Sequence, residues 1–206
     1  MTDSSRPGKI VCVGRNYRAH AKELGNDVPA EPLIFLKPPS SVIRSGGTIE
    51  LPTVSSQVEY EGEIGVVIGS RLSRADEAQA KSSIRGIVAL NDVTARDLQR
   101  SDGQWTRAKG FDTFCPVGRE VPVPADLSSL EVTTRVNGSV RQHASATEMV
   151  FAIPMLLAYI SSIMTLEPGD VVATGTPSGV GRLEGGDVVE VQVATSLVRN
   201  SVNAAG

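Results

Sequence analysis

Short apolar runs separated by turn residues recur along the chain and predict a fold dominated by β-strands. The runs that predict buried strands are Lys9–Val13, Leu33–Pro38, Ile64–Ile68, Ile84–Leu90 and Val171–Ala173. Apolar and polar residues alternate from Asp187 to Val193, which predicts a half-buried strand with its valines on one face. The Asn137-Gly138 pair, between Val132–Val136 and Ser139–Gln142, predicts a β-hairpin.

Fewer segments carry a helical pattern. They are a segment between Asn16 as N-cap and Gly25 as C-terminal stop, Ser73–Ser83, Thr94–Arg100, and about Pro154 to Met164. The last is expected to lie in the core on an apolar face formed by Met155, Leu156, Tyr159, Ile160 and Ile163. With no internal repeat, the simplest account is a single strand-rich α+β domain over residues 9–206, after a frayed tail at residues 1–8.

Composition narrows the classes of partner. The chain has 206 residues, 20 basic and 23 acidic side chains and a net charge of −3, which argues against a nucleic-acid surface or an anionic-membrane anchor. No apolar stretch is long enough to span a bilayer or to serve as the core of a signal peptide, so we expect a cytoplasmic protein. Cys12 and Cys115 lack metal-site spacing and are expected to be buried free thiols.

The stretch from Glu59 to Gly69 runs from acidic directly into apolar residues. In an extended strand, Glu61 and Glu63 point to one face because side chains alternate. Two carboxylates side by side repel each other unless a cation or proton lies between them, and a hard divalent cation suits oxygen ligands. The alternative is a solvated strand edge that carries a few glutamates.

Three other segments place reactive side chains where such a site could use them. On a helix, His20 and Glu23 are neighbours, and a carboxylate on one imidazole nitrogen raises the basicity of the other; the alternative is a charged surface helix. Asp92 follows the Ile84–Leu90 strand and is a candidate third ligand, or else an N-cap for the helix after it. Lys109 pairs with a substrate carboxylate or with the acidic site, or else extends to solvent.

Several motifs together resemble the fumarylacetoacetate hydrolase family over nearly the whole chain. They are Gly14-Arg15-Asn16-Tyr17 with His20 and Glu23, Phe35-Leu36-Lys37-Pro38, Glu61-Gly62-Glu63 with Gly65, Asn91 to Asp97, Gln104-Trp105 with Lys109 and Phe111-Asp112, and Thr174-Gly175-Thr176-Pro177. The chain is most similar to the short acylpyruvate hydrolase and oxaloacetate decarboxylase branch.

This resemblance implies a mixed β-sandwich roll, a homodimer, and Mg²⁺ or Mn²⁺ held by Glu61, Glu63 and Asp92. It implies a 2-oxo acid substrate, with His20 oriented by Glu23 as general base and Lys109 stabilising charge or a substrate carboxylate. The remaining substrate contacts that it implies are Thr176 with nearby loop amides for the C1 carboxylate, and Arg15 and Gln104 in the pocket wall. Glu59 is expected at the rim of the site, and His143 at the surface.

Three reactions are compatible with such a site. The expected one is hydrolysis of the carbon–carbon bond of an acylpyruvate to pyruvate and a carboxylic acid, because the histidine dyad can activate water. Decarboxylation of oxaloacetate and isomerisation of a 2-hydroxydienedioate are alternatives at the same metal site. A protein that only binds a 2-oxo acid through its metal is the non-enzymatic alternative, and it would need no base.

Overall fold

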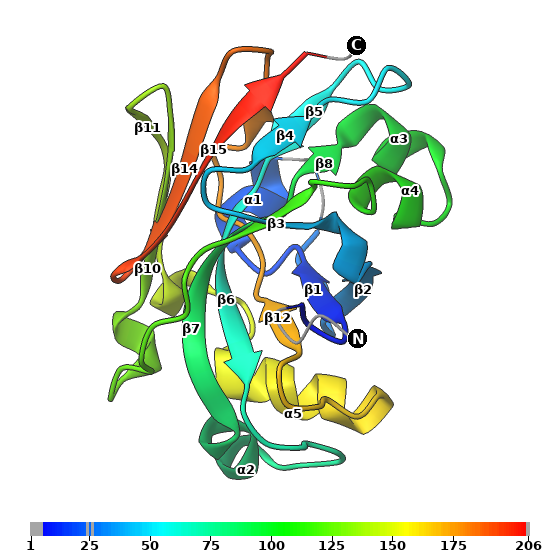
Figure 1. Ribbon diagram of the computed structural model, residues 1–206. Coiled ribbons are helices and arrows are strands. Elements are labelled where there is room, and N and C mark those ends of the chain that lie inside the picture. The colour runs from blue at the N-terminus through cyan, green and yellow to red at the C-terminus, as the bar shows by residue number, and fades with distance from the viewer. Residues whose placement is uncertain (1–5, 24, 26, 205–206) are drawn as a thin grey trace.

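A seven-stranded mixed sheet forms the centre of the molecule in the computed structural model, which describes residues 6–23, 25 and 27–204 (Figure 1). In spatial order its strands are β2 (Leu33–Lys37), β1 (Ile10–Gly14), β12 (Val171–Ala173), β6 (Gly62–Ile68), β7 (Ile84–Asn91), β9 (Cys115–Val117) and β3 (Val42–Arg44). β1 pairs in parallel with β12, with Ile10 opposite Val171, so the start of the described chain lies beside a strand formed late in the sequence.

The central sheet is strongly curled. β2 and β3 are its two edges, yet only residues 38–41 separate them along the chain. Five residue steps reach at most about 18 Å, whereas six strand spacings in a flat sheet would require about 29 Å. The sheet therefore bends until its two edges approach each other.

Two smaller sheets complete the strand structure. One contains β11 (Ser139–Ser145), β10 (Glu131–Val136), β14 (Val188–Val193), β15 (Ser196–Asn203) and β4 (Thr48–Glu50), and the other contains β13 (Gly181–Arg182), β5 (Val58–Tyr60) and β8 (Thr94–Ala95). The five-stranded sheet packs beside β6 and β7 (Figure 1). Its strands supply Val132, Val191 and Val193 to the main core.

The described part of the chain forms five α-helices. They are α1 (Arg18–Glu23), α2 (Glu77–Ser82), α3 (Arg96–Ser101), α4 (Thr106–Lys109) and α5 (Ile153–Ile163), with 3₁₀ turns at Pro39–Ser41, Leu127–Ser129 and Ala146–Glu148. α2 and α5 pack together at one end, and α3 and α4 lie together at the other (Figure 1). No described helix is both long enough and apolar enough to cross a bilayer.

The strand pattern predicted from the sequence is confirmed, and so is the strand-rich α+β roll. The Asn137-Gly138 turn has φ of 52° and 79°, as a tight hairpin requires. Cys12 and Cys115 are free and buried, and burial raises the pKa of the Cys115 thiol to about 12. His143 is exposed, as expected, and part of the expected N-terminal tail lies outside the described residues.

Three local predictions were wrong. Asn16 does not cap α1: its side chain bonds Phe151 and the Thr174 carbonyl, because a buried tertiary contact outcompetes the local one. On α5, Ile163 is 53% exposed, and the buried face is formed by Ile153, Leu156, Leu157, Ile160 and Ser161. Thr94 begins the short strand β8 rather than a helix.

Candidate active site

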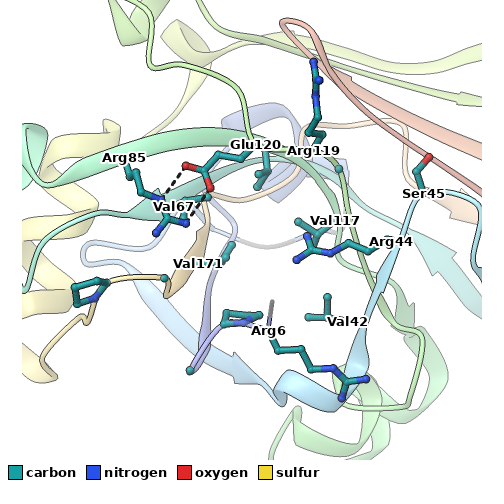
Figure 2. A pocket seen from close by; sticks show the side chains of 16 residues that line it. Arg6, Val42, Arg44, Ser45, Val67, Arg85, Val117, Arg119, Glu120 and Val171 are labelled. Atoms are coloured by element: carbon teal, nitrogen blue, oxygen red, sulfur yellow. Dashed lines mark hydrogen bonds and ion pairs between the residues drawn. The ribbon is translucent and has the colours of Figure 1, made fainter. Parts of the chain in front are cut away.

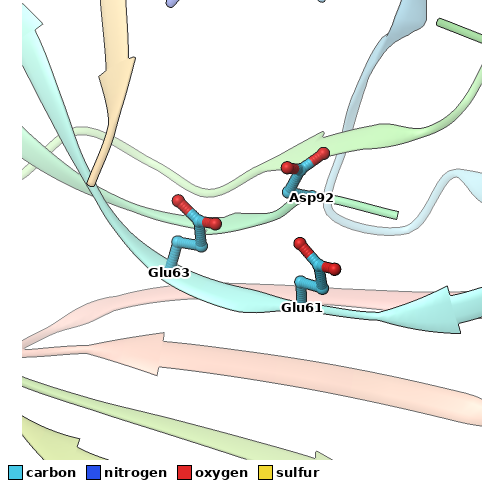
Figure 3. Close-up of side chains that lie close together, drawn as sticks. All are labelled: Glu61, Glu63 and Asp92. Carbon is cyan, nitrogen blue, oxygen red and sulfur yellow. The ribbon is translucent and has the colours of Figure 1, made fainter. Parts of the chain in front are cut away.

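Three carboxylates converge where β6 and β7 meet. Glu61 and Glu63 flank the first residue of β6, and Asp92 directly follows β7 (Figure 3). One carboxylate oxygen from each lies within 4.8 Å of the others, and the residues are 5%, 2% and 0% exposed, respectively. The solvated strand edge considered for the glutamates is therefore wrong.

Local backbone bonds explain why these side chains converge. The Asn91 side chain accepts from the Glu61 amide at 2.9 Å, and the Asp92 amide donates to the Glu61 carbonyl at 2.8 Å. Opposite them, the Gly175 amide donates to Glu63 Oε2 at 2.7 Å. Because each ligand is tied to a neighbouring segment, the cluster is preorganised by the fold.

Buried cations hold two of the carboxylates. Lys109 Nζ donates to Glu61 Oε2 and to Asp92 Oδ2, at 2.7 Å each. Lys37 Nζ donates to the other Asp92 oxygen at 2.6 Å, and Arg96 donates to the other Glu61 oxygen. Lys109 therefore does not extend to solvent but pairs with the acidic site.

The third carboxylate has no cationic partner among the described residues. Burial favours the neutral form of Glu61, but Lys109 and Arg96 outweigh that effect and hold its pKa below the ordinary value. Burial together with the charges of Asp92 and Glu61 raises the pKa of Glu63 well above the ordinary value. The negative charge of ionised Glu63 is therefore not balanced by a neighbouring cationic side chain among the described residues. A divalent cation, which prefers oxygen ligands, fits this set of three carboxylates.

Glu59 is part of the same charge cluster. It is 7% exposed, and its carboxylate accepts from Arg96 Nε at 2.8 Å and from the side-chain amide of Gln57, Nε2, at 2.6 Å. The strand breaks at Glu61, between β5 and β6, so the simple alternation used to place Glu59 does not continue through it. Glu59 is therefore a buried partner of Arg96 and does not lie at an open rim.

The predicted dyad is formed beside the carboxylates. His20 is 4% exposed, and its Nδ1 lies 3.2 Å from Glu23 Oε2, so a neutral imidazole that donates there presents Nε2 as a base. The Gly179 amide donates to Glu23 at 3.0 Å, and the Tyr60 hydroxyl donates to the Gly179 carbonyl at 2.9 Å. Glu23 is thus itself held by the glycine-rich loop.

A small cavity of about 60 Å³ joins the dyad to the carboxylates. Its lining residues are Val13, Gly14, Arg15, His20, Phe35, Glu61, Glu63, Asp92, Arg96, Gln99, Trp105, Lys109 and Thr176. Arg15 and Thr176 stand where the sequence predicts them, whereas Gln104 is exposed and is not among the lining residues. The glutamine that lines the cavity is Gln99, which accepts from Arg96.

The loop from Thr174 to Gly181 forms hydrogen bonds with residues on both sides of the site. The Thr176 hydroxyl donates to the Gly62 carbonyl at 2.9 Å, and the amides of Gly175 and Gly179 bond Glu63 and Glu23. These amides were expected to bind a substrate carboxylate, but in this structure they bond side chains of the protein. The loop therefore connects the metal-ligating side and the dyad side of the cavity.

Sequence reasoning missed Lys37, Arg96 and Gln99. Lys37 had one visible signal, an isolated lysine at the end of an apolar strand, which is 1% exposed in the structure. The carboxylate partners of Arg96 lie 35 and 37 residues away, so nothing in its local sequence identifies them.

A second hollow opens at the other end of the same sheet face. It measures about 760 Å³, and its lining residues include Val88 together with Val67 and Val171, which are labelled in Figure 2. The Arg85 guanidinium forms a double hydrogen bond with Glu120, at 2.9 Å for each contact. Among the described residues, Glu61, Glu63 and Asp92 form the only group of side chains that could hold a metal ion, and they line the smaller cavity.

Comparison with known proteins agrees with this geometry. Residues 9–203 match the family described as Fumarylacetoacetate (FAA) hydrolase C-terminal. A mitochondrial oxaloacetate decarboxylase of Dictyostelium discoideum is 46% identical over an alignment of 189 positions, and the match covers 88% of this chain and 87% of the relative. A mitochondrial oxaloacetate tautomerase of Arabidopsis thaliana is 48% identical over an alignment of 187 positions, and the match covers 88% of this chain and 84% of the relative.

A solved structure shares the fold. The crystal structure of 2-hydroxyhepta-2,4-diene-1,7-dioate isomerase from Mycobacterium marinum matches with a TM-score of 0.89 at 44% identity, covering 98% of this chain and 76% of that chain. These relatives carry names of decarboxylating, tautomerising and isomerising enzymes.

Proposed function

Because the chain belongs to the fumarylacetoacetate hydrolase family, we propose that it is a divalent-metal-dependent enzyme that forms the enolate of a small 2-oxo dicarboxylic acid, with oxaloacetate as the representative substrate. The observation that carries this proposal is the buried cluster of Glu61, Glu63 and Asp92 beside the His20–Glu23 dyad. The decarboxylase and tautomerase names of the relatives support the same substrate class.

Charge and size both favour a short anionic substrate. Three cations, Lys37, Arg96 and Lys109, face four carboxylates, so the ionised cluster carries one uncompensated negative charge that a divalent cation would turn into a positive one. A cavity of about 60 Å³ corresponds to the volume of about two water molecules. Oxaloacetate, with four carbons, is a short 2-oxo dicarboxylic acid and requires less displacement of the cavity wall than longer acids of that class.

Glu61, Glu63 and Asp92 would hold Mg²⁺ or Mn²⁺, which supplies Lewis-acid stabilisation of negative charge on the substrate oxygens. Lys109 lies between Glu61 and Asp92 and places a fixed positive charge beside the developing enolate. Arg15 lines the cavity and presents a guanidinium for a substrate carboxylate.

His20 moves the proton. In decarboxylation the C3–C4 bond of oxaloacetate breaks, CO₂ leaves, and the electron pair passes to the C2 oxygen as the enolate, which is then protonated at C3. In keto–enol interconversion, His20 Nε2 takes the proton from C3 and returns it to the oxygen, or the reverse. Glu23 holds the imidazole in the tautomer that leaves Nε2 free to accept.

Hydrolysis of an acylpyruvate is the second candidate, and the dyad is the observation that favours it. His20 would remove a proton from water, the hydroxide would attack the distal carbonyl, and cleavage would leave the same pyruvate enolate together with a carboxylic acid. Decarboxylation requires no attacking water, so the candidates differ in how strongly they depend on the base.

Parallel turnover assays test the proposal. Purified protein with Mg²⁺ or Mn²⁺ is incubated with oxaloacetate, acetylpyruvate and fumarylpyruvate, and oxaloacetate tautomerisation is followed separately from CO₂ release. We expect metal-dependent turnover of oxaloacetate that is lost in Glu61→Ala. Turnover of acylpyruvates alone would favour the second candidate, and metal binding without turnover of any of them would leave a binding protein.

A further inference from the structure

One side chain of the five-stranded sheet packs directly against the start of β6, where Glu61 and Glu63 lie. Gln142 lies on β11 and is 1% exposed. Its Oε1 accepts from the Gly62 amide at 2.9 Å, and its Nε2 donates to Thr176 Oγ1 and to the Pro177 carbonyl, at 2.8 Å each. Both hydrogens of this amide group are therefore engaged across two segments of the site.

Gly62 is the residue between the two glutamate ligands, so its backbone sets their separation. Its amide is held by Gln142 and its carbonyl by the Thr176 hydroxyl, which in turn accepts from Gln142. The three residues form a closed ring of hydrogen bonds. Gln142 thus fixes the start of β6 relative to the glycine-rich loop.

Close contact between the sheets makes this arrangement possible. A Cβ at Gly62 would lie 1.9 Å from Thr134 Oγ1 on β10, so only glycine allows this approach. Thr134 is the strand partner of Gln142, and its buried hydroxyl has no hydrogen-bond partner among the described residues. Of these two paired side chains, only Gln142 bonds the site.

We infer that Gln142 is a positioning residue, which sets the spacing of Glu61 and Glu63 through Gly62 and the position of the Thr176–Pro177 loop. This inference rests on the metal site of the proposed function. It adds a contribution from the five-stranded sheet, none of whose residues lines the catalytic cavity.

Replacement by leucine tests both roles together. Gln142→Leu keeps the bulk of the side chain but leaves the Gly62 amide and the Pro177 carbonyl without their partner. We expect Mn²⁺ affinity, measured by calorimetry, to fall by about 10- to 100-fold, as is typical when a group that orients a ligand is lost. The matched control is Thr134→Val, which removes a hydroxyl that makes no bond and should stay within about twofold of wild type.

Gln142→Glu separates the two roles and serves as the second variant if Gln142→Leu does not fold. A carboxylate still accepts from the Gly62 amide but cannot donate to Pro177 or Thr176. We expect Mn²⁺ affinity within about threefold of wild type, whereas the affinity of the Mn²⁺-loaded protein for oxalate should fall by about tenfold or more because the loop is released.

The outcomes distinguish this inference from the proposed function. Wild-type Mn²⁺ and oxalate affinities in Gln142→Leu, or equal losses in Thr134→Val, would overturn the positioning role. Wild-type oxalate affinity in Gln142→Glu would overturn the role in holding the loop. If the wild-type protein binds Mn²⁺ and oxalate but turns over no 2-oxo acid, the proposed function fails while the role of Gln142 stands.

Discussion

At the scale of single residues, the three carboxylates that could hold a metal ion differ in how they are neutralised. Glu61 and Asp92 each accept from two cationic groups, whereas Glu63 accepts from one backbone amide. A buried ion pair that loses one partner is strongly destabilised, whereas removal of an uncompensated buried charge relieves a penalty. The same chemical change should therefore have opposite effects at Glu61 and at Glu63.

Glu61→Gln should destabilise the metal-free protein by about 3 kcal/mol, since Lys109 and Arg96 each lose one of their two carboxylate partners. Glu63→Gln should stabilise it by about 1 kcal/mol at neutral pH. Because the pKa of Glu63 is raised, this gain exists above that pKa and disappears as the pH falls below the ordinary glutamate value. Denaturant unfolding after EDTA treatment measures both changes in the free energy of unfolding. A change of the same sign in the two variants would contradict the charge assignment.

His20 can be separated from the metal site in the same way. His20→Gln should lower turnover by about 100-fold or more, the usual contribution of a general base. Its Mn²⁺ and oxalate affinities should stay near those of wild type, because His20 contacts none of the three carboxylates by a hydrogen bond among the described residues. Full hydrolase or tautomerase activity in this variant would remove His20 from the mechanism.

At the scale of elements, the loop from Thr174 to Gly181 connects both halves of the site. At its far end Gly179 has φ of 97°, and a Cβ there would lie 2.1 Å from the Arg141 carbonyl, so the loop follows a path open only to glycine. Tyr60 fixes that end by donating to the Gly179 carbonyl.

Tyr60→Phe removes this one bond and should therefore disturb Glu23 and His20 while leaving the metal ligands in place. We expect turnover to fall by about tenfold, with unchanged Mn²⁺ affinity and a shifted pH–rate profile. Tyr159→Phe on α5 is the control and should behave as wild type. Loss of metal affinity in Tyr60→Phe would show that the loop does not separate the two halves.

The elements themselves could be predicted where the pattern is local. Strands such as β6 and β7, the hairpin turn and the stop at Gly25 all follow from side-chain periodicity and turn chemistry. Asn16 and α5 could not, because tertiary partners decided them: Asn16 bonds residues more than 130 positions away, and Ile163 projects outward from the last turn of its helix. Periodicity identifies an apolar face but not which part of it is covered.

The candidate site likewise contains residues that local sequence identifies and residues that only tertiary contacts identify. Glu61 with Glu63, and His20 with Glu23, were found because the members of each pair are close in the sequence. Asp92 was found because it follows an apolar strand. Arg96 and Gln142 were not found, because their role exists only after separate strands are brought together. The candidate site residues could therefore be named from the sequence, whereas the side chains that hold them required the fold.

At the scale of the whole molecule, a cation would link segments from several parts of the chain. Its ligands would lie at the start of β6 and directly after β7, and Lys109 on α4 and Gly175 after β12 bond those side chains. A ligand that binds only the folded state at 100 times its dissociation constant adds about 2.7 kcal/mol of stability. For a chain of this size, such a gain should raise the melting temperature by about 5–10 °C.

Scanning calorimetry with and without saturating Mn²⁺ measures this shift, and Glu61→Ala should abolish it. An equal rise in Glu61→Ala would place the cation elsewhere on the molecule.

The parallel pairing of β1 with β12 also has a consequence for biosynthesis. Ile10 leaves the ribosome about 160 residues before Val171, its neighbour in the sheet, and β4 likewise waits for β15. Such long-range closure is slow, and until it occurs β1 lacks its β12 neighbour and exposes a strand edge open to other chains. A nascent chain that stops before β12 cannot bring Gly175 to Glu63, so we expect metal binding to arise only once nearly the whole chain has emerged.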